Sequence, residues 1–205
     1  MGVGPHIGLE WYDFIQQPER MYSRSSEPVR FERDCPAVLV PQGDEVELPA
    51  GSVGYITQGL GGSFTVFVDG NLFRIAGQDA DAIGKEPTPP LVLPEGADDD
   101  AVEELVWHQL RTCFDPEIPI NVVDLGLIYE AKVLPHPEQP GQRLVEVRMT
   151  LTAPGCGMGE VLVSDVSDKL KLIPTVVDTD VELVFEPPWT QHMMSEAARL
   201  EVGMF

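Results

Sequence analysis

The residue best placed to do chemistry in this sequence is Cys156, within the segment Ala153-Pro-Gly-Cys-Gly157. The segment lies between an expected strand and the first turn of an expected helix, where unpaired backbone N–H groups and the helix dipole stabilise a thiolate. The flanking glycines would let a ligand or a partner protein approach the sulfur closely. Cys156 is therefore a candidate nucleophile or metal ligand, and a small residue buried at a tight turn is the alternative.

Two carboxylates stand in a dense segment that runs from Asp115 to Tyr129. Prolines on both sides of Glu117 fix φ, so we expect this side chain to be presented on a rigid turn. Asp124 lies among apolar residues, where a carboxylate is costly to desolvate unless it meets donors. We expect it to cap the helix that begins near Cys156 or to bind a metal, and a structural bond to backbone N–H groups is the alternative.

Thr150 and Thr152 lie on one face of the strand expected before Pro154. Their hydroxyl groups could donate hydrogen bonds to a cluster sulfide or to Asp124, although threonine is also common on solvent-facing strand surfaces. Trp189 follows two prolines, and it is either a lid over this site or a packing residue at the start of a helix.

Known enzyme signatures are missing from the sequence. It contains no dinucleotide-binding fingerprint, no phosphate-binding loop and no Gly-x-Ser-x-Gly elbow. The histidines have no metal-binding spacing, and no Cys-x-x-Cys pair is present, which argues against a self-contained structural zinc site. Cys113 is expected on the apolar face of a helix and Cys35 at the start of the first β element.

The elements that must position these residues alternate between helix and strand over residues 101–205. Hydrophobic spacing first predicts a helix that begins with a capping box at Asp100 and Glu103 and ends near Phe114. Two strands follow, one over Val122–Val133, broken at Gly126, and one around residues 145–151. The remaining elements are a helix that opens at Pro154, a strand over Val176–Phe185, and a helix that begins at Trp189 and ends at Gly203. The order α-β-β-α-β-α predicts an α+β domain with helices packed on a small mixed sheet.

The first half of the sequence has a different pattern. Residues 35–86 show five short expected strands separated by turn residues, including a hairpin at Asp69-Gly70, and predict a small all-β domain, either a sandwich or a half-barrel. Residues 87–100 are rich in proline and acidic residues and read as a linker. Residues 1–34 are expected to be an irregular leader.

The chain is 205 residues long and carries 13 Lys and Arg against 34 Asp and Glu, for a net charge of −21. Such an acidic surface repels phosphate backbones and anionic lipid, so we expect neither nucleic acid nor membrane as a partner. No apolar run reaches membrane-spanning length, and the first residues lack a secretion signal. Three widely spaced cysteines favour free thiols in a reducing cytoplasm.

Three motifs of the sequence resemble those of a known family. They are Asp115-Pro-Glu-Ile-Pro with Val123-Asp-Leu-Gly-Leu-Ile-Tyr129, Met149-Thr-Leu-Thr-Ala-Pro-Gly-Cys-Gly-Met158, and Val184-Phe-Glu-Pro-Pro-Trp189. In this order and spacing they resemble the small iron–sulfur cluster assembly domain, over about residues 98–205. The stretch from Asp34 to Ala82 resembles the N-terminal extension of the SufT-type members.

The resemblance implies a maturation factor, not an enzyme, that helps transfer iron–sulfur clusters to client apoproteins. It places the family's reactive cysteine, a metal ligand, at Cys156, the loop carboxylates at Glu117 and Asp124, and the supporting threonine at Thr152. Gly157 follows the cysteine where many relatives have proline.

Iron–sulfur clusters usually take four thiolate ligands, so one cysteine per chain favours transient binding, or a homodimer, over storage. The implied partners are an iron–sulfur scaffold and client apoproteins. Two alternatives stay open: an accessory subunit of a metalloenzyme complex, and a thiol-dependent enzyme with Cys156 as nucleophile.

Overall fold

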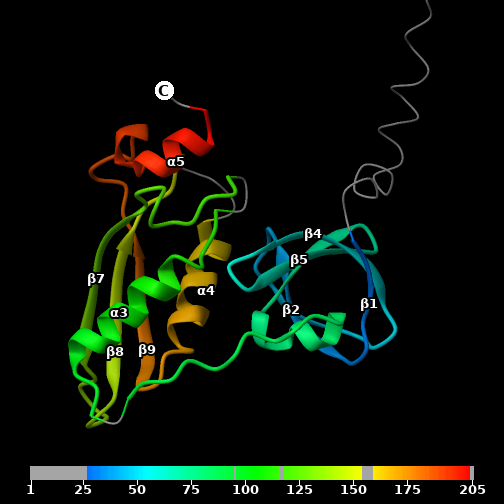
Figure 1. The fold of residues 1–205 in the computed structure, drawn as a ribbon, viewed down its shortest axis with the longest axis horizontal. Helices are drawn as coiled ribbons and strands as arrows, with labels where there is room; N and C mark the ends of the chain where they lie inside the picture. Colours follow the sequence, from blue (N-terminus) through cyan, green and yellow to red (C-terminus); the bar gives the residue numbers. More distant parts are fainter. Residues whose placement is uncertain (1–26, 95, 116–117, 154–158, 204–205) are drawn as a thin grey trace, which may run out of the picture. The chain divides into compact units, whose positions relative to one another are not determined.

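The structure, a computed structural model, describes residues 27–94, 96–115, 118–153 and 159–203. These residues form two compact units, one built mainly from the chain up to Thr88 and the other from Pro89 onward (Figure 1). Each unit has its own core of buried hydrophobic side chains.

The first unit is a single six-stranded sheet with the strand order β1-β4-β5-β6-β2-β3. Figure 1 shows the sheet strongly curled, as expected for a half-barrel. A short 3-10 helix, η1 (Gly77–Ile83), follows the last strand. The strands are β1 (Glu27–Arg30), β2 (Cys35–Val40), β3 (Glu45–Leu48), β4 (Val53–Leu60), β5 (Ser63–Val68) and β6 (Asn71–Ile75).

Local turn chemistry explains the β5–β6 hairpin. The register pairs Val68 with Asn71, which leaves Asp69 and Gly70 as the two turn residues, and both have positive φ (47° and 87°). Two positive φ values match the right-handed twist of the flanking strands, and the Asp-Gly pair tolerates them. The predicted hairpin is therefore present.

The expected irregular leader is wrong for the residues just before position 35. β1 lies inside that segment and pairs antiparallel with β4, from Glu27 opposite Ile56 to Arg30 opposite Val53. Phe31 follows β1 and is among the largest fully buried side chains, at 1% exposure. The short strand was missed because its four residues carry two charges and a proline, which hide the β pattern.

The second unit is α+β, as predicted, with helices and a mixed three-stranded sheet in the order β7-β8-β9. β8 pairs antiparallel with β7 and parallel with β9. The elements are α3 (Asp99–Leu110), β7 (Ile128–Pro135), β8 (Arg143–Met149), α4 (Gly159–Leu170), β9 (Val176–Leu183), the 3-10 helix η2 (Gln191–Met193) and α5 (Glu196–Glu201).

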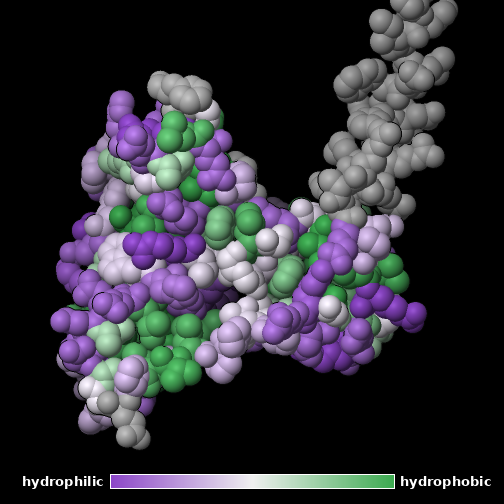
Figure 2. Space-filling model, viewed as in Figure 1, coloured by the Kyte–Doolittle hydropathy of each residue, from purple (hydrophilic) through white to green (hydrophobic). Residues whose placement is uncertain are grey.

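The two faces of this sheet have opposite character. Val145, Val147 and Met149 alternate along β8 and are fully buried in the core to which α3 and α4 contribute. On the opposite face, Arg148 of β8 pairs with Glu130 of β7 on one side and with Glu182 of β9 on the other. Apolar and charged residues therefore segregate with the period of two that a half-buried strand requires. In Figure 2 hydrophilic residues cover much of the visible surface of the unit.

Three predicted boundaries of the second unit are wrong. The first helix is capped by Asp98, whose carboxylate accepts from the backbone N–H of Ala101 at 3.0 Å, and not by the expected box at Asp100 and Glu103. It ends at Leu110, and a tighter turn, with Cys113 N bonding to Leu110 O at 3.1 Å, carries Cys113 into the core. The last helix covers only Glu196–Glu201, because η2 takes up the chain before it.

The predicted strand over Val122–Val133 is also wrong in its first half. Residues 122–126 form turns, and β7 begins only at Ile128. Val122, Leu125 and Leu127 are fully buried, so the apolar pattern is real, but a compact turn supplies the burial. Gly126 has a φ of +70°, which lies outside the strand region and ends any extended run there.

A buried polar network joins α3 to α4. The ammonium group of Lys169 donates to Thr112 O at 2.6 Å and lies 3.1 Å from the Asp165 carboxylate. Gln109 Nε2 donates to Lys169 O at 3.0 Å, and Gln109, Asp165 and Lys169 are all buried.

Among the helices of the described residues, none is long and apolar enough to cross a membrane.

We expect Lys169→Met to lower the free energy of unfolding by about 3 kcal/mol, because the substitution removes a buried cation that lies 3.1 Å from the buried Asp165 carboxylate. The double variant Asp165→Leu/Lys169→Met should regain roughly half of that loss, because it removes both charges. Urea denaturation followed by circular dichroism measures both. If the double variant is less stable than Lys169→Met, the loss in Lys169→Met does not come mainly from the buried Asp165 charge, and the prediction is wrong.

Candidate functional site

Three separate segments of the chain meet at one end of the β7–β8–β9 sheet. Ile128, the first residue of β7, is opposite Met149, the last residue of β8, and Met149 is also opposite Leu183, the last residue of β9. Two hydrogen bonds extend this alignment beyond the strands, Thr150 N to Leu127 O at 2.9 Å and Val184 N to Met149 O at 2.8 Å. The segments that carry the three sequence motifs therefore leave the sheet at the same end (Figure 1).

Asp124 is half-buried in the turn before β7 and has a dedicated partner. Asn121 Nδ2 donates to Asp124 Oδ2 at 2.6 Å. Asn121 Oδ1 accepts from the backbone N–H of Val123 at 3.1 Å and of Asp124 at 2.9 Å. Among the described residues, a side-chain donor holds this carboxylate. The expected cap of the helix near Cys156 falls on residues outside the described ones.

The start of the same loop is organised by Asp115, which is only 7% exposed. Its Oδ1 accepts from Ile118 N at 2.9 Å, and its own N–H donates to Ile120 O at 3.1 Å. These two bonds join Asp115 to Ile118 and Ile120 within the loop. Glu117, one of the predicted carboxylates, lies outside the described residues.

The chain after β9 packs against the Asp124 loop. Trp189 Nε1 donates to Leu125 O at 2.8 Å, and Ser195 N donates to Asp124 O at 2.8 Å. At Gly126 an added Cβ would lie 2.2 Å from Met193 O, so only glycine permits this approach. Tyr129 OH, at the start of β7, donates to Pro187 O at 2.7 Å. Trp189 therefore holds the loop in place, which corresponds to the packing alternative.

The two threonines lie on the segment that leaves β8. Thr150 is 1% exposed, whereas Thr152 is half-buried. Within the described part of the chain, no hydrogen bond joins Thr152 to Asp124, although their segments lie at the same sheet end. Cys156, the predicted reactive residue, lies outside the described residues.

The other two cysteines are sealed inside the protein. Cys113 and Cys35 are both 0% exposed. The Cys35 thiol lies 3.4 Å from Pro36 O, and burial raises its pKa from about 9 to about 11. Neither has the accessible, electropositive surroundings of a reactive thiol.

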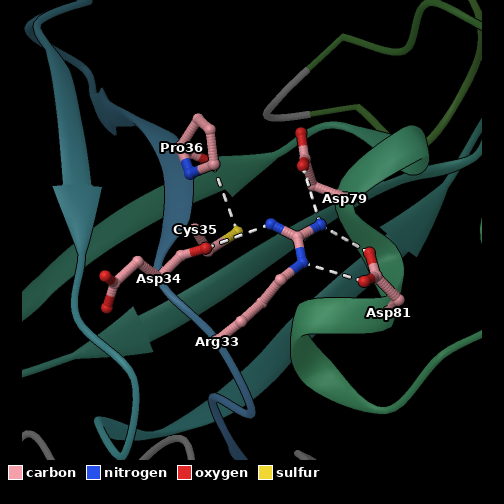
Figure 3. Close-up of polar contacts among 6 residues, drawn as sticks. All are labelled: Arg33, Asp34, Cys35, Pro36, Asp79 and Asp81. Carbon is pink, nitrogen blue, oxygen red and sulfur yellow. Dashed lines mark hydrogen bonds and ion pairs between the residues drawn. The ribbon is translucent and has the colours of Figure 1, made fainter.

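Next to Cys35, Arg33 ties the start of β2 to η1 (Figure 3). Its guanidinium donates to Asp81 Oδ2 at 2.8 Å, to Asp79 Oδ1 at 2.9 Å and to Asp34 O at 3.0 Å. The Arg33 hydrogen bonds hold the pKa of Asp81 below its usual range. These bonds engage Nε, Nη1 and Nη2 of the guanidinium group, so the cluster acts as a local brace of the first unit.

The sequence did not single out Asn121, Tyr129 or Ser195, although all three shape this sheet end. Asn121 was detectable as an Asx residue three positions before a carboxylate, in a stretch where such residues favour turns. Among the described residues, no group of three or more His, Cys, Asp or Glu side chains could hold a metal ion.

Comparison with known proteins identifies the second unit. Residues 103–199 match the family described as iron–sulfur cluster assembly protein. The chain is 45% identical over 101 residues to the Fe-S protein maturation auxiliary factor of Porphyromonas gingivalis, which covers 49% of this chain and 90% of that protein. The chain belongs to the iron–sulfur cluster assembly protein family.

Two further relatives align with about half of the chain. The Fe-S protein maturation auxiliary factor YitW of Bacillus subtilis is 34% identical over 106 residues, covering 52% of this chain and 98% of that protein. The factor SufT of Staphylococcus aureus is 40% identical over 90 residues, covering 44% of this chain and 96% of that protein. Family membership therefore rests on the second unit, and the resemblance of residues 34–82 to a SufT-type extension stays a prediction.

We expect Trp189→Phe to loosen the Asp124 loop, because it removes the donor to Leu125 O while keeping the aromatic ring. Amide hydrogen exchange of residues 122–127 should become about tenfold faster, since a lost hydrogen bond is worth about 1–1.5 kcal/mol. Trp107→Phe is the matched control, because Trp107 is also half-buried against this core but its indole donates to the exposed Glu103 side chain of its own helix and not to the loop. Equal exchange rates in the two variants would contradict a bracing role for Trp189.

We expect iodoacetamide at about pH 8 to label Cys156 in the folded protein and to spare Cys35 and Cys113. Both spared thiols are buried, and the Cys35 thiolate forms only as the pH rises through about 11. Peptide mass spectrometry locates the label, and the same reaction in urea, where all three cysteines should react, is the control. Labelling of Cys35 or Cys113 in the folded state would contradict their burial.

Proposed function

We propose that this protein is a maturation factor that helps transfer iron–sulfur clusters to client apoproteins and that Cys156 carries the exchange. The observation that supports this most strongly is the convergence of the three family motifs at one end of the β7–β8–β9 sheet. Sheet pairing accounts for that convergence, since Met149 is opposite both Ile128 and Leu183. Curated relatives that match this unit are named Fe-S protein maturation auxiliary factors.

The proposed roles follow from where the chain runs. Cys156 stands in the connection between the end of β8 and Gly159, the first residue of α4. A thiol before a helix of this length is stabilised as a thiolate by the helix dipole, and a thiolate is the form that binds iron. Thr152 precedes it on the same segment and would donate to the bound cargo. Asp124 and Glu117 would supply carboxylate oxygens from the neighbouring loop.

The cysteine content favours handover over storage. A stable cluster usually needs four thiolates, whereas Cys35 and Cys113 are buried and therefore poorly suited to bind a cluster. The remaining ligands would therefore come from an iron–sulfur scaffold, from a client apoprotein or from a second copy of the chain. The role is non-catalytic, the cluster is cargo, and a reducing cytoplasm would keep the thiol free.

We expect Cys156→Ala to abolish maturation and Asp124→Asn to reduce it about tenfold or more, since each substitution removes a cargo contact. The variants are expressed in cells that lack the native copy, and the activity of iron–sulfur enzymes in extracts is divided by their protein level. Asp180→Asn is the matched control for Asp124→Asn, because Asp180 is exposed on β9.

Normal maturation by Cys156→Ala would overturn the exchange mechanism. Anaerobic reconstitution, followed by visible absorption and by counts of iron and sulfide, tests the cargo directly on wild type and Cys156→Ser. Saturable turnover of an electrophilic substrate by the purified protein would instead establish the thiol-enzyme alternative. Co-purification with an enzyme at fixed stoichiometry would establish the accessory-subunit alternative.

A further inference from the structure

We propose that Asn121 is a positioning residue that orients the Asp124 carboxylate at the cargo site. This inference rests on the proposed function, and it assigns a role to a side chain outside the predicted set. Asn121 is the described side chain that hydrogen-bonds to this carboxylate, with Nδ2 2.6 Å from Asp124 Oδ2. The two residues are three positions apart in one turn, so the contact needs no other element.

The orientation of the Asn121 amide is determined by its surroundings. Its Oδ1 faces two backbone N–H donors, from Val123 at 3.1 Å and Asp124 at 2.9 Å. An amide flipped by 180° would point its NH₂ group at both donors and its oxygen at a carboxylate, and it would lose all three bonds. Asn121 therefore presents a donor to Asp124, and one planar group couples the shape of the turn to the carboxylate.

The hydrogen bond restricts which oxygen Asp124 can offer. The terminal torsion of an aspartate is broad, so a free carboxylate would sample many orientations. A donor on Oδ2 narrows that range, and a bond to an ionised acceptor is stronger than a neutral one. Oδ1 accepts no hydrogen bond from the described residues. Asn121 would thus leave Oδ1 as the oxygen that meets the cargo.

The backbone at Asp124 is held from other directions too. Ser195 N donates to Asp124 O at 2.8 Å, and Leu125 N donates to Asn121 O at 3.0 Å. Asn121 itself forms an antiparallel bridge with Phe114. Loss of the Nδ2 donor alone should leave the loop in place and free only the carboxylate, so positioning and folding can be separated by experiment.

The variant Asn121→Asp separates positioning of the carboxylate from folding of the loop. The substitution keeps an oxygen that accepts from the two backbone N–H groups, because Asp and Asn are both good Asx-turn residues. It replaces the donor to Asp124 by a second negative charge, which repels the carboxylate it formerly held. Asn71→Asp is the matched control, because Asn71 is exposed and its amide donates to the backbone oxygen of Asp69 in the β5–β6 hairpin, with no carboxylate among its hydrogen-bond partners in the described residues.

We expect Asn121→Asp to slow the appearance of iron–sulfur enzyme activity about tenfold when iron is restored to cells lacking the native copy. Hydrogen exchange at the amides of Val123 and Asp124 should stay protected, which a loss of loop structure would not allow. In the background of Asp124→Asn, the change at Asn121 should slow maturation no further, because a positioning residue acts only through its partner.

Where the single variants fold, either of two outcomes would overturn the inference. One is normal maturation by Asn121→Asp while Asp124→Asn is impaired, which leaves the proposed function standing. The other is normal maturation by Asp124→Asn, which removes Asp124 from the site. Failure of the proposed function itself is seen separately, as normal maturation by Cys156→Ala.

If Asn121→Asp loses amide protection, the exchanged variant Asn121→Asp/Asp124→Asn shows whether Asn121 serves the carboxylate or only the fold. It restores the amide–carboxylate pair in reverse, so folding should recover. Recovered folding with maturation still lost supports the inference, because the carboxylate is then at the wrong position. Recovery of both folding and maturation overturns it, since Asn121 would then serve only the fold.

Discussion

The whole second unit depends on the pairing of β8, which runs antiparallel to β7 on one side and parallel to β9 on the other. This mixed arrangement brings the beginning of one strand and the ends of two others to a common edge. Residues that are distant in the sequence can then cooperate without any long-range loop of their own. Displacement of Met149 from its place between Ile128 and Leu183 would separate the three family motifs.

The parts of the fold that the sequence predicted are those governed by local rules. The hairpin at Asp69-Gly70 follows from the φ values that its two residues accept, and β8 follows from strict alternation. The same rules wrongly predicted a strand from Val122 to Leu127, because the buried residues of this stretch lie in turns that the neighbouring chain stabilises. The contact of Trp189 with Leu125 O could not be predicted either, since it depends on tertiary packing across 64 positions.

Two of the three thiols of the protein serve packing, and the reason is physical. Cys35 and Cys113 act as small hydrophobic residues in two separate cores, and at Cys35 burial also raises the pKa of the thiol. Residue counting alone cannot assign such fates, because the same side chain serves packing or chemistry according to its surroundings. The sequence distinguished Cys113 by its helical spacing and Cys156 by its glycines, whereas the burial of Cys35 needed the structure.

The bracing of the Asp124 loop by the chain around Trp189 has a consequence for synthesis on the ribosome. Trp189 is made 64 residues after Leu125, a delay of roughly 3–13 s at ordinary elongation rates. Throughout that interval a nascent chain has the loop but lacks the residues that hold it, since Ser195 and Met193 also come late. The Asp124 loop can therefore reach its braced conformation only after residues 189–195 have been made.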